Sequence, residues 1–260
     1  MYKDGPIVLV DGDSIAYAAG AQASEEECKK KIEEIFTRIY TRCQPSEIRI
    51  YLEDWKAPKI NFRSHVAVSR KYKDRTGSKK PEHLKYAREL IELIVWNCDI
   101  PFKMAYEEVT FTAVSYIEAE DAAAIEHERL VIEGKKVILA RIDKDLAQVP
   151  GVHYNYFKDE MSMIDSQTAL VNFYTQLLIG DATDSITGLP GVGKKTAEKL
   201  LHHSQTQDDM MTTVAMEYKK RGFSYQYLLE QARLLYILRT IDDVYQFPLL
   251  EVDYITLETT

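Results

Sequence analysis

The sequence predicts an α/β protein in which a parallel sheet is flanked by helices and followed by a helical C-terminal region. Three observations support this fold class. Short apolar runs alternate with segments of helical periodicity over the first part of the chain. The strongest of these runs end directly at acidic residues, at the strand ends where parallel sheets gather functional groups. Beyond about residue 160 the strand signals fade while the helical signals continue.

The first half of the chain supplies two predicted strands and a helix. Residues 7–10 (IVLV) form an apolar run that predicts a buried strand ending at Asp11. Residues 24–43 begin with a serine N-cap and an acidic first turn and carry an apolar stripe at helical spacing. Residues 47–52 (EIRIYL) predict a second strand, followed by Asp54 after one further acid.

Two more helices and a third strong strand follow. The apolar spacing of residues 82–97 and 116–130 is helical, and residues 136–142 (KVILARI) predict a strand that ends at Asp143. Residues 165–178 predict an amphipathic helix, with further helical segments to about residue 241.

The domain organisation follows from this change of pattern. We expect an α/β domain over residues 1–180 and a helical region over residues 181–260, with no internal repeat or low-complexity linker between them. At 260 residues, 45% hydrophobic and 28% charged, the chain can bury a sizeable core, which excludes a disordered or collagenous protein.

Location and redox state can be predicted from what the sequence lacks. It contains no run of about 20 apolar residues, and its first residues lack a secretory signal, so we expect a cytoplasmic protein without a membrane partner. The cysteines, Cys28, Cys43 and Cys98, are odd in number and form no CxxC pair. Free thiols in a reducing compartment are therefore expected.

Charge is unevenly distributed along the chain. The net charge of −8 argues at first against a nucleic-acid partner, since affinity for phosphate backbones comes largely from positive charge. Residues 56–88, however, hold eleven basic and two acidic residues, a net charge of +9. This basic segment is either a solvated surface or a cationic segment that contacts nucleic-acid phosphates, with Tyr72 placed to stack on a base.

Acidic residues gather at positions that a parallel sheet would bring together. Asp11, Asp54 and Asp143 each follow a predicted strand, so they should project from the same edge. Glu118 and Asp121 share one face of a predicted helix. So many carboxylates repel one another unless cations are present, and oxygen-rich clusters suit Mg²⁺ or Mn²⁺. Any single acidic pair is also explained as a helix cap or surface group.

A glycine-rich turn precedes a helix late in the chain. In GLPGVGKKTAEKLL, residues 188–201, Gly191 and Gly193 are free to adopt positive φ before the helix begins. Backbone N–H groups at that helix start, beside Lys194 and Lys195, form an anion site suited to a nucleic-acid phosphate. The pattern is that of a helix-hairpin-helix. The spacing excludes a P-loop, and an ordinary helical corner is the alternative.

Taken in order, six motifs resemble those of the structure-specific 5′ nucleases, the flap endonucleases and 5′→3′ exonucleases with a PIN-like α/β core. Within this family the chain resembles the small phage enzymes, including the exonucleases of T7-like phages. The resemblance spans about residues 6 to 241. The motifs are VDGDS at 10–14, LED at 52–54, FR at 62–63 with YK at 72–73, IEAEDAAA at 117–124, IDKDL at 142–146 and GDATDSITGLPGVGKKTA at 180–197.

The resemblance implies a role for each matching residue. The metals, two or more Mg²⁺ or Mn²⁺ ions, would be surrounded by Asp11, Asp54, Glu118, Glu120, Asp121, Asp143, Asp145, Asp181 and Asp184. Lys73 would approach the scissile phosphate, with Asp143 and Asp145 as its catalytic partners, from an arch formed by the basic segment. DNA contacts would come from Arg63, Arg70, Lys71, Tyr72, Arg75, Gly191, Val192, Gly193, Lys194 and Lys195, with a monovalent cation such as K⁺ at the hairpin.

Three positions depart from the family pattern. Glu120 stands where aspartate is usual, Arg75 comes one residue early in the arch, and Asp13 replaces a small polar residue. Asp13 is a spectator, a supporting group or an additional ligand.

The predicted function is metal-dependent hydrolysis of DNA near 5′ ends by a two-metal mechanism, with a 5′-ended or flapped duplex as partner. Three alternatives stay open. These are a non-catalytic helix-hairpin-helix DNA-binding protein, an RNA-cleaving PIN-type nuclease, and a phosphatase with Asp11 as nucleophile.

Overall fold

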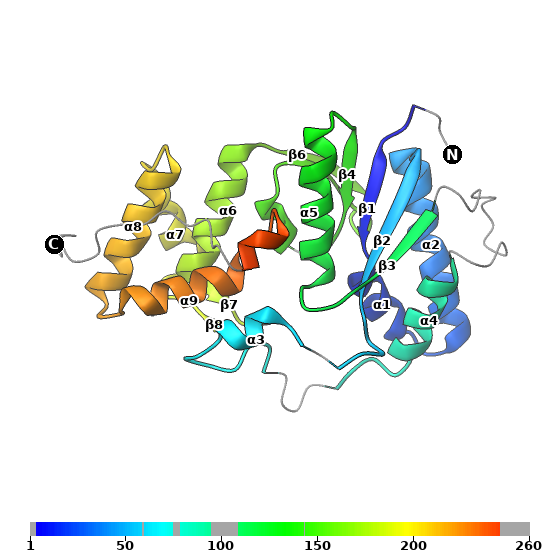
Figure 1. The fold of residues 1–260 in the computed structure, drawn as a ribbon, viewed down its shortest axis with the longest axis horizontal. Coiled ribbons are helices and arrows are strands. Elements are labelled where there is room, and N and C mark those ends of the chain that lie inside the picture. The colour runs from blue at the N-terminus through cyan, green and yellow to red at the C-terminus, as the bar shows by residue number, and fades with distance from the viewer. Residues whose placement is uncertain (1–3, 59, 75–78, 95–108, 143, 245–260) are drawn as a thin grey trace.

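The computed structural model describes residues 4–58, 60–74, 79–94, 109–142 and 144–244 (Figure 1). A six-stranded sheet with the order β3-β2-β1-β4-β5-β6 forms the N-terminal part. Neighbouring strands from β3 to β5 pair in parallel, and β6 pairs antiparallel with β5. The strands are β1 (Ile7–Asp11), β2 (Glu47–Glu53), β3 (Val109–Val114), β4 (Val137–Ala140), β5 (Gly151–Asn155) and β6 (Glu160–Ile164).

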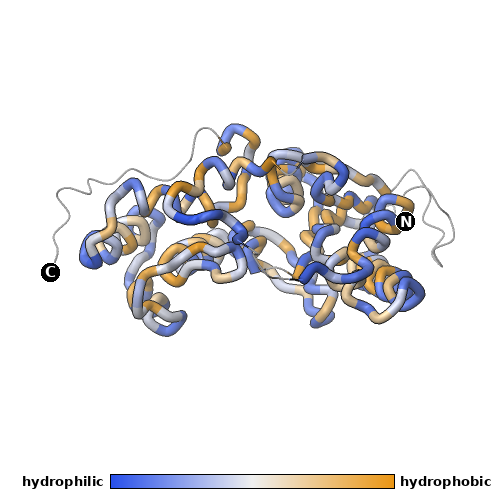
Figure 2. The backbone as a smooth tube through the Cα atoms, turned by 90° about the horizontal axis from the view of Figure 1, so that it is seen from below, coloured by the Kyte–Doolittle hydropathy of each residue, from blue (hydrophilic) through white to orange (hydrophobic). Residues whose placement is uncertain are grey.

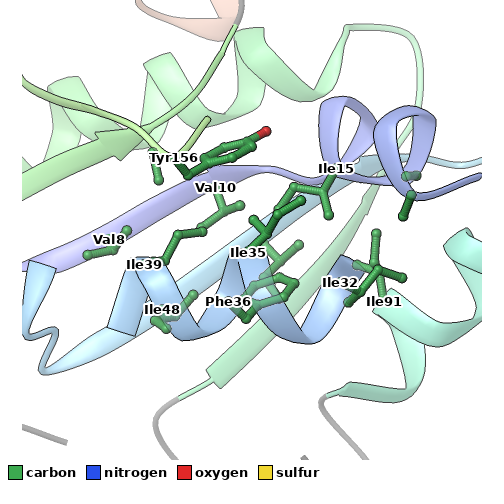
Figure 3. Close-up of a cluster of buried hydrophobic side chains, with 14 of the residues drawn as sticks. Val8, Val10, Ile15, Ile32, Ile35, Phe36, Ile39, Ile48, Ile91 and Tyr156 are labelled. Atoms are coloured by element: carbon green, nitrogen blue, oxygen red, sulfur yellow. The ribbon is translucent and has the colours of Figure 1, made fainter. Parts of the chain in front are cut away.

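Helices cover both faces of this sheet because the side chains of its central strands alternate between two cores. Val8 and Val10 pack on one face with helices α1, α2 and α4, as Figure 3 shows for the cluster around Phe36. Ile7 and Leu9 point to the other face and pack against α5. These helices are α1 (Gly12–Gly20), α2 (Glu25–Cys43), α4 (Leu84–Ile94) and α5 (Ala119–Ile132).

A separate hydrophobic core lies in the C-terminal helices. Tyr174 and Tyr218 are fully buried there, and Figure 2 shows helical segments whose turns alternate between hydrophobic and hydrophilic residues. The elements are α6 (Ser166–Ile179), β7 (Gly180–Asp181), β8 (Ile186–Thr187), α7 (Lys194–Leu201), α8 (Gln207–Lys220) and α9 (Tyr225–Leu235). The short helices α3 (Phe62–Val66), η2 (Asp145–Gln148) and η3 (Ile241–Val244) complete the described chain.

The predicted α/β fold class is confirmed, and the three strong strands appear as β1, β2 and β4. Sequence patterns missed α1, β3 and the β5–β6 hairpin. Gly12 and Gly20 stand at the two ends of α1 and weaken its helical signal. Strand β6 lies at the sheet edge with four exposed residues, so it lacks the apolar alternation that identifies a strand.

The connections place a switch point in the middle of the sheet. From β1 the chain builds outward to β2 and β3 on one side, and it continues with β4 and β5 on the other. The carboxyl ends of β1 and β4 therefore meet where the strand order reverses. None of the helices in the described part of the chain combines the length and hydrophobicity that a bilayer crossing requires.

Candidate active site

A cavity of about 780 Å³ opens beside the carboxyl ends of β1 and β2 and the start of α5. Open α/β sheets bind ligands at such a switch point. Carboxylates from five stretches of the chain line the cavity: Asp11, Asp13, Glu53, Asp54, Glu118, Glu120, Asp145, Asp181 and Asp184. The fold therefore brings together seven of the nine acids predicted as metal ligands.

The backbone at the start of α1 fixes Asp11. This residue ends β1 and caps α1, since its Oδ1 accepts hydrogen bonds from the N–H groups of Asp13 at 3.0 Å and Ser14 at 3.4 Å. A Cβ atom on Gly12 would lie 2.7 Å from the carbonyl oxygen of Tyr51. Glycine at this position thus allows α1 to begin directly against β2, which holds Asp11 at the cavity.

A tight turn after β2 orients Asp54. Its Oδ1 accepts hydrogen bonds from the N–H groups of Lys56 and Ala57, both at 3.1 Å. The N–H of Asp54 donates to the carbonyl of Val114, at the end of β3, at 2.8 Å. The turn therefore fixes the orientation of the Asp54 side chain, and the hydrogen bond to Val114 fixes the position of the turn relative to the sheet.

Lys73 and Glu118 form an ion pair inside the cavity, with Nζ 2.5 Å from Oε1. Burial by itself would raise the pKa of Glu118, but the charges of Lys73 and Arg63 outweigh it and lower the pKa to about 2. Lys73 has a φ of 47°, in the left-handed region, and its N–H donates to the carbonyl of Asp184 at 2.9 Å. This left-handed conformation costs a residue with a Cβ about 1–2 kcal/mol.

The structure corrects the predictions for Asp121 and Arg63. Asp121 does not line the cavity, because its carboxylate is fully buried in a two-pronged ion pair with Arg63, at 2.5 and 2.8 Å. It also accepts the N–H of Glu118 at 3.0 Å, completing a capping box at the start of α5. Arg63, predicted to contact DNA, is 1% exposed and is part of the protein interior. Asp121 thus fixes Glu118 at the start of α5, and Arg63 holds Asp121 in place.

Asp181 and Asp184 are positioned by the short β7–β8 pair. A Cβ atom on Gly180 would lie 2.2 Å from the backbone of Gly188, so these glycines let the two strands cross closely. Burial opposes ionisation of Asp181, but Lys144, with Nζ 2.7 Å away, lowers its pKa below the usual range. Burial raises the pKa of Asp184, against the opposing charge of Lys73.

The IDKDL stretch contains two of the acids predicted as metal ligands, Asp143 and Asp145. Asp145 begins η2 and accepts a hydrogen bond from the side chain of Gln176 on α6. Asp143 lies outside the described residues, so its predicted place at the carboxyl end of β4 stays a prediction.

The described residues of the basic segment are partly buried and partly exposed. Tyr72, predicted to stack on a base, is 8% exposed, and its hydroxyl donates to Asp184 at 3.0 Å, so that prediction is corrected to a buried contact. Arg70 and Lys71 are exposed, and the side chain of Lys71 is 77% accessible. Arg75 lies outside the described residues.

The glycine turn before α7 matches the predicted positive φ at Gly191 only. Gly191 has a φ of 75°, whereas Gly193, the N-cap residue of α7, has a φ of −102°. Val192 is buried in the helical core, while Lys194 and Lys195 are exposed in the first turn of the helix. The start of α7 is therefore exposed at Gly193, Lys194 and Lys195, with two ammonium groups in its first turn.

The donor chemistry of the cavity fits a hard divalent cation, because all nine acids offer carboxylate oxygens. These acids are spread around the cavity. Among the described residues no three His, Cys, Asp or Glu side chains are gathered tightly enough to hold a metal ion. Lysines instead contact three of the acids: Lys73 pairs with Glu118 and Asp184, and Lys144 pairs with Asp181.

Sequence reasoning missed several residues that contact these acids. Lys144 carried a signal, because it lies between two aspartates in IDKDL. Gln176 and Arg88 carried none, since they reach Asp145 and Asp13 from distant helices. Glu53 was noted after β2 but was not among the predicted ligands, and it lines the cavity.

No protein-family model matches the chain. DNA polymerase I of Geobacillus stearothermophilus is 28% identical over 231 residues, which cover 80% of this chain and 24% of that protein. The 5′-3′ exonuclease of Buchnera aphidicola subsp. Baizongia pistaciae is 27% identical over 56% of this chain and 47% of its own length. The flap endonuclease Xni of Colwellia psychrerythraea is 32% identical over 48% of this chain and 43% of its own length. The chain thus spans less than half the length of these relatives.

Solved structures show the same fold. A bacteriophage T5 5′-exonuclease with bound zinc superimposes with a TM-score of 0.64 at 15% identity, covering 88% of each chain. A complex of the T5 flap endonuclease with DNA and metal ions gives a TM-score of 0.62 at 14% identity, again over 88% of each chain. With its homology to a 5′-3′ exonuclease, a flap endonuclease and DNA polymerase I, this shared fold confirms the resemblance to the structure-specific 5′ nucleases.

Proposed function

We propose that this protein is a divalent-metal-dependent 5′ nuclease that hydrolyses DNA phosphodiester bonds at or near 5′ ends by a two-metal mechanism, and that it acts in the cytoplasm. The observation that carries the proposal is the cavity lined by nine carboxylates at the switch point of the sheet. A structural role would not require this gathering of like charges, which repel one another in the absence of cations.

Mg²⁺ or Mn²⁺ would be held by Asp11, Asp54, Glu118, Glu120, Asp143, Asp145, Asp181 and Asp184. Bound ions of this kind lower the pKa of a water and stabilise the leaving oxygen of a phosphodiester. Side chains of the cavity supply the rest of the site. Lys73, part-buried beside Glu118, presents an ammonium group at the cavity, where it can bind and orient the scissile phosphate.

DNA binding is proposed to involve two surfaces. The exposed Arg70 and Lys71 of the basic segment, with Arg75, would steer and hold the 5′ strand. The turn before α7, with Lys194 and Lys195, would hold the duplex backbone, and its carbonyl groups would suit a K⁺ ion. In this proposal residues 1–180 form the catalytic domain and residues 181–260 the duplex-binding region. The T5 flap endonuclease in complex with DNA and metal ions has the same fold, which supports DNA as the partner.

The test measures cleavage of labelled duplexes with a recessed 5′ end or a 5′ flap, in Mg²⁺ and in EDTA. Wild-type protein should cut in Mg²⁺ and not in EDTA. Asp143→Ala should abolish cutting, whereas Asp159→Asn, at an exposed aspartate that pairs with Arg42, should leave it unchanged.

Two of the alternative functions predict different results in this test. DNA binding without cleavage in Mg²⁺ or Mn²⁺ would indicate a binding protein. Cleavage of RNA with no cutting of either DNA substrate would indicate an RNA-cleaving nuclease. Either result, or an Asp143→Ala variant that cuts as well as wild type, contradicts the proposed function.

A further inference from the structure

Asp13 is a cavity acid whose role the family resemblance leaves open, and the structure shows what its carboxylate contacts. Its Oδ1 accepts a hydrogen bond from Nη2 of Arg88 at 2.7 Å. Its Oδ2 accepts the backbone N–H of Glu53, also at 2.7 Å. Both oxygens therefore have donors from the protein itself. Asp13 lies at the start of α1, so these contacts join α1 to the end of β2 and to α4.

The side chain of Arg88 is buried in the protein interior. Its side chain is 7% exposed, against 18% for that of Asp13. The buried Nε atom of Arg88 has no hydrogen-bond partner in the described part of the chain. The ion pair with Asp13 is therefore the main interaction that offsets the cost of burying this guanidinium group. A charged pair in this environment needs both members, because either one alone is a buried charge without a partner. Arg88 lies in the basic segment of the sequence, but because it is buried it does not contribute to a cationic surface.

A second contact from the same helix reaches the same turn. Glu92, one helical turn after Arg88, accepts a hydrogen bond from Nε1 of Trp55 at 2.9 Å and pairs with Nζ of Lys56 at 2.5 Å. Residues at spacing i and i+4 lie on one face of a helix. Helix α4 therefore holds the chain on both sides of Asp54. Before Asp54 it acts indirectly, because Arg88 binds Asp13 and Asp13 binds the N–H of Glu53. After Asp54 it binds Trp55 directly through Glu92.

We infer that Asp13 and Arg88 act as a positioning pair that fixes the end of β2, and with it the carboxylate of Asp54, for metal binding. The inference rests on the proposed function. Asp13 is on this basis a supporting residue and not an additional ligand. Asp13 and Asp54 differ in how their carboxylate oxygens are bound. The N–H groups of Lys56 and Ala57 both donate to Oδ1 of Asp54. The donors to Asp13 instead bind both of its carboxylate oxygens.

The test combines Mn²⁺ binding, followed by electron paramagnetic resonance of the free ion, with cleavage kinetics. The variants are Asp13→Asn, Arg88→Gln, the double variant and Arg88→Lys. Each neutral single variant should weaken Mn²⁺ binding by about 10–100-fold, as loss of a group that orients a ligand does. The double variant should be no weaker than either single one, because all three variants break the same ion pair. The number of ions bound at saturation should stay unchanged.

Arg88→Lys keeps the buried positive charge and should recover part of the affinity, and it provides the comparison if Arg88→Gln does not fold. Arg42→Gln with Asp159→Asn is the matched control, because that pair has a similar distance of 2.8 Å but is about half exposed on both sides. Circular dichroism checks the fold of every variant. Mn²⁺ affinity in these controls should equal that of wild type.

Two results would overturn the inference while leaving the proposed function intact. In one, Asp13→Asn removes a bound ion and Arg88→Gln binds Mn²⁺ like wild type, which makes Asp13 a ligand. In the other, both single variants bind Mn²⁺ like wild type. If wild-type protein itself binds no Mn²⁺ and cuts no DNA, the proposed function fails instead.

Discussion

Arg63 and Asp121 form a buried two-pronged ion pair that connects the two halves of the molecule. The guanidinium also donates to the carbonyls of Leu234 at 3.0 Å and Tyr236 at 2.7 Å, at the end of α9 and just after it. The carboxylate accepts the N–H of Leu238 at 3.1 Å. Because Asp121 also caps α5, the same pair holds the C-terminal helices and the start of the helix that carries Glu118.

Replacing Arg63 should destabilise the protein strongly. Arg63→Met leaves the Asp121 carboxylate buried without its partner, so we expect a loss of about 3–5 kcal/mol in the free energy of unfolding. Urea denaturation measures it. The free energy of unfolding of Arg63→Lys should lie between those of wild type and Arg63→Met, because an ammonium group cannot make the two-pronged contact. Arg42→Gln, which breaks an exposed pair, should cost under about 1 kcal/mol, and an equal loss at both sites would contradict the role given to Arg63.

Lys73 should matter more for the reaction than for binding. Lys73→Ala removes the ammonium group that faces Glu118, and cleavage should fall by about 100-fold or more. Duplex affinity, measured by fluorescence anisotropy, should change little. Lys71→Ala is the neighbouring control, because this exposed lysine should affect affinity and rate to the same modest extent. Equal losses of rate and affinity for Lys73→Ala would make Lys73 a phosphate anchor.

The hairpin lysines should set the salt dependence of duplex binding. Replacing both Lys194 and Lys195 by alanine should weaken binding to all sequences alike. The slope of log K against log salt should fall by about 1 for each phosphate that the protein ceases to bind. Lys29→Ala with Lys30→Ala, exposed on α2 away from the hairpin, should leave the slope as it is. An unchanged slope in the Lys194 and Lys195 variant would place the duplex elsewhere.

Two buried histidines should make the fold sensitive to acid. His127 and His153 are 3% and 1% exposed, and burial lowers the pKa of each to about 4, assisted by Arg239 and Arg141 respectively. In the unfolded chain a histidine titrates near 6.5, so below that pH the unfolded state binds more protons. Stability should therefore be full above about pH 7 and be lost as the pH falls through 6.5 toward 4.

Urea unfolding at about pH 7.5 and about pH 5 measures this effect, which should reach about 1–2 kcal/mol for each histidine. His127→Gln removes one titrating group and should make stability less dependent on pH over this range. A variant whose stability falls with acid as steeply as that of wild type would show that other groups are responsible.

Local patterns in the sequence predicted much of the fold and most of the acids of the site. Strands β1, β2 and β4 are buried on both faces, so their apolar runs stand out without knowledge of the fold. Because parallel strands share a carboxyl edge, the acids after them could be assigned to one place, and the cavity contains Asp11 and Asp54 as expected. The edge strand β6 and the glycine-flanked α1 have no such local signal.

The sequence by itself determined the α/β class, the order of the core strands along the chain and the residues that supply the carboxylates, because these depend on the spacing of near neighbours. Only the tertiary structure decided which charges face the cavity and which face one another. Arg63 and Arg88 belong to a basic segment, yet both are buried against aspartates that come from other elements. Their burial depends on partners 58 and 75 residues away in sequence. The spacing of neighbouring residues in the sequence does not indicate such pairing.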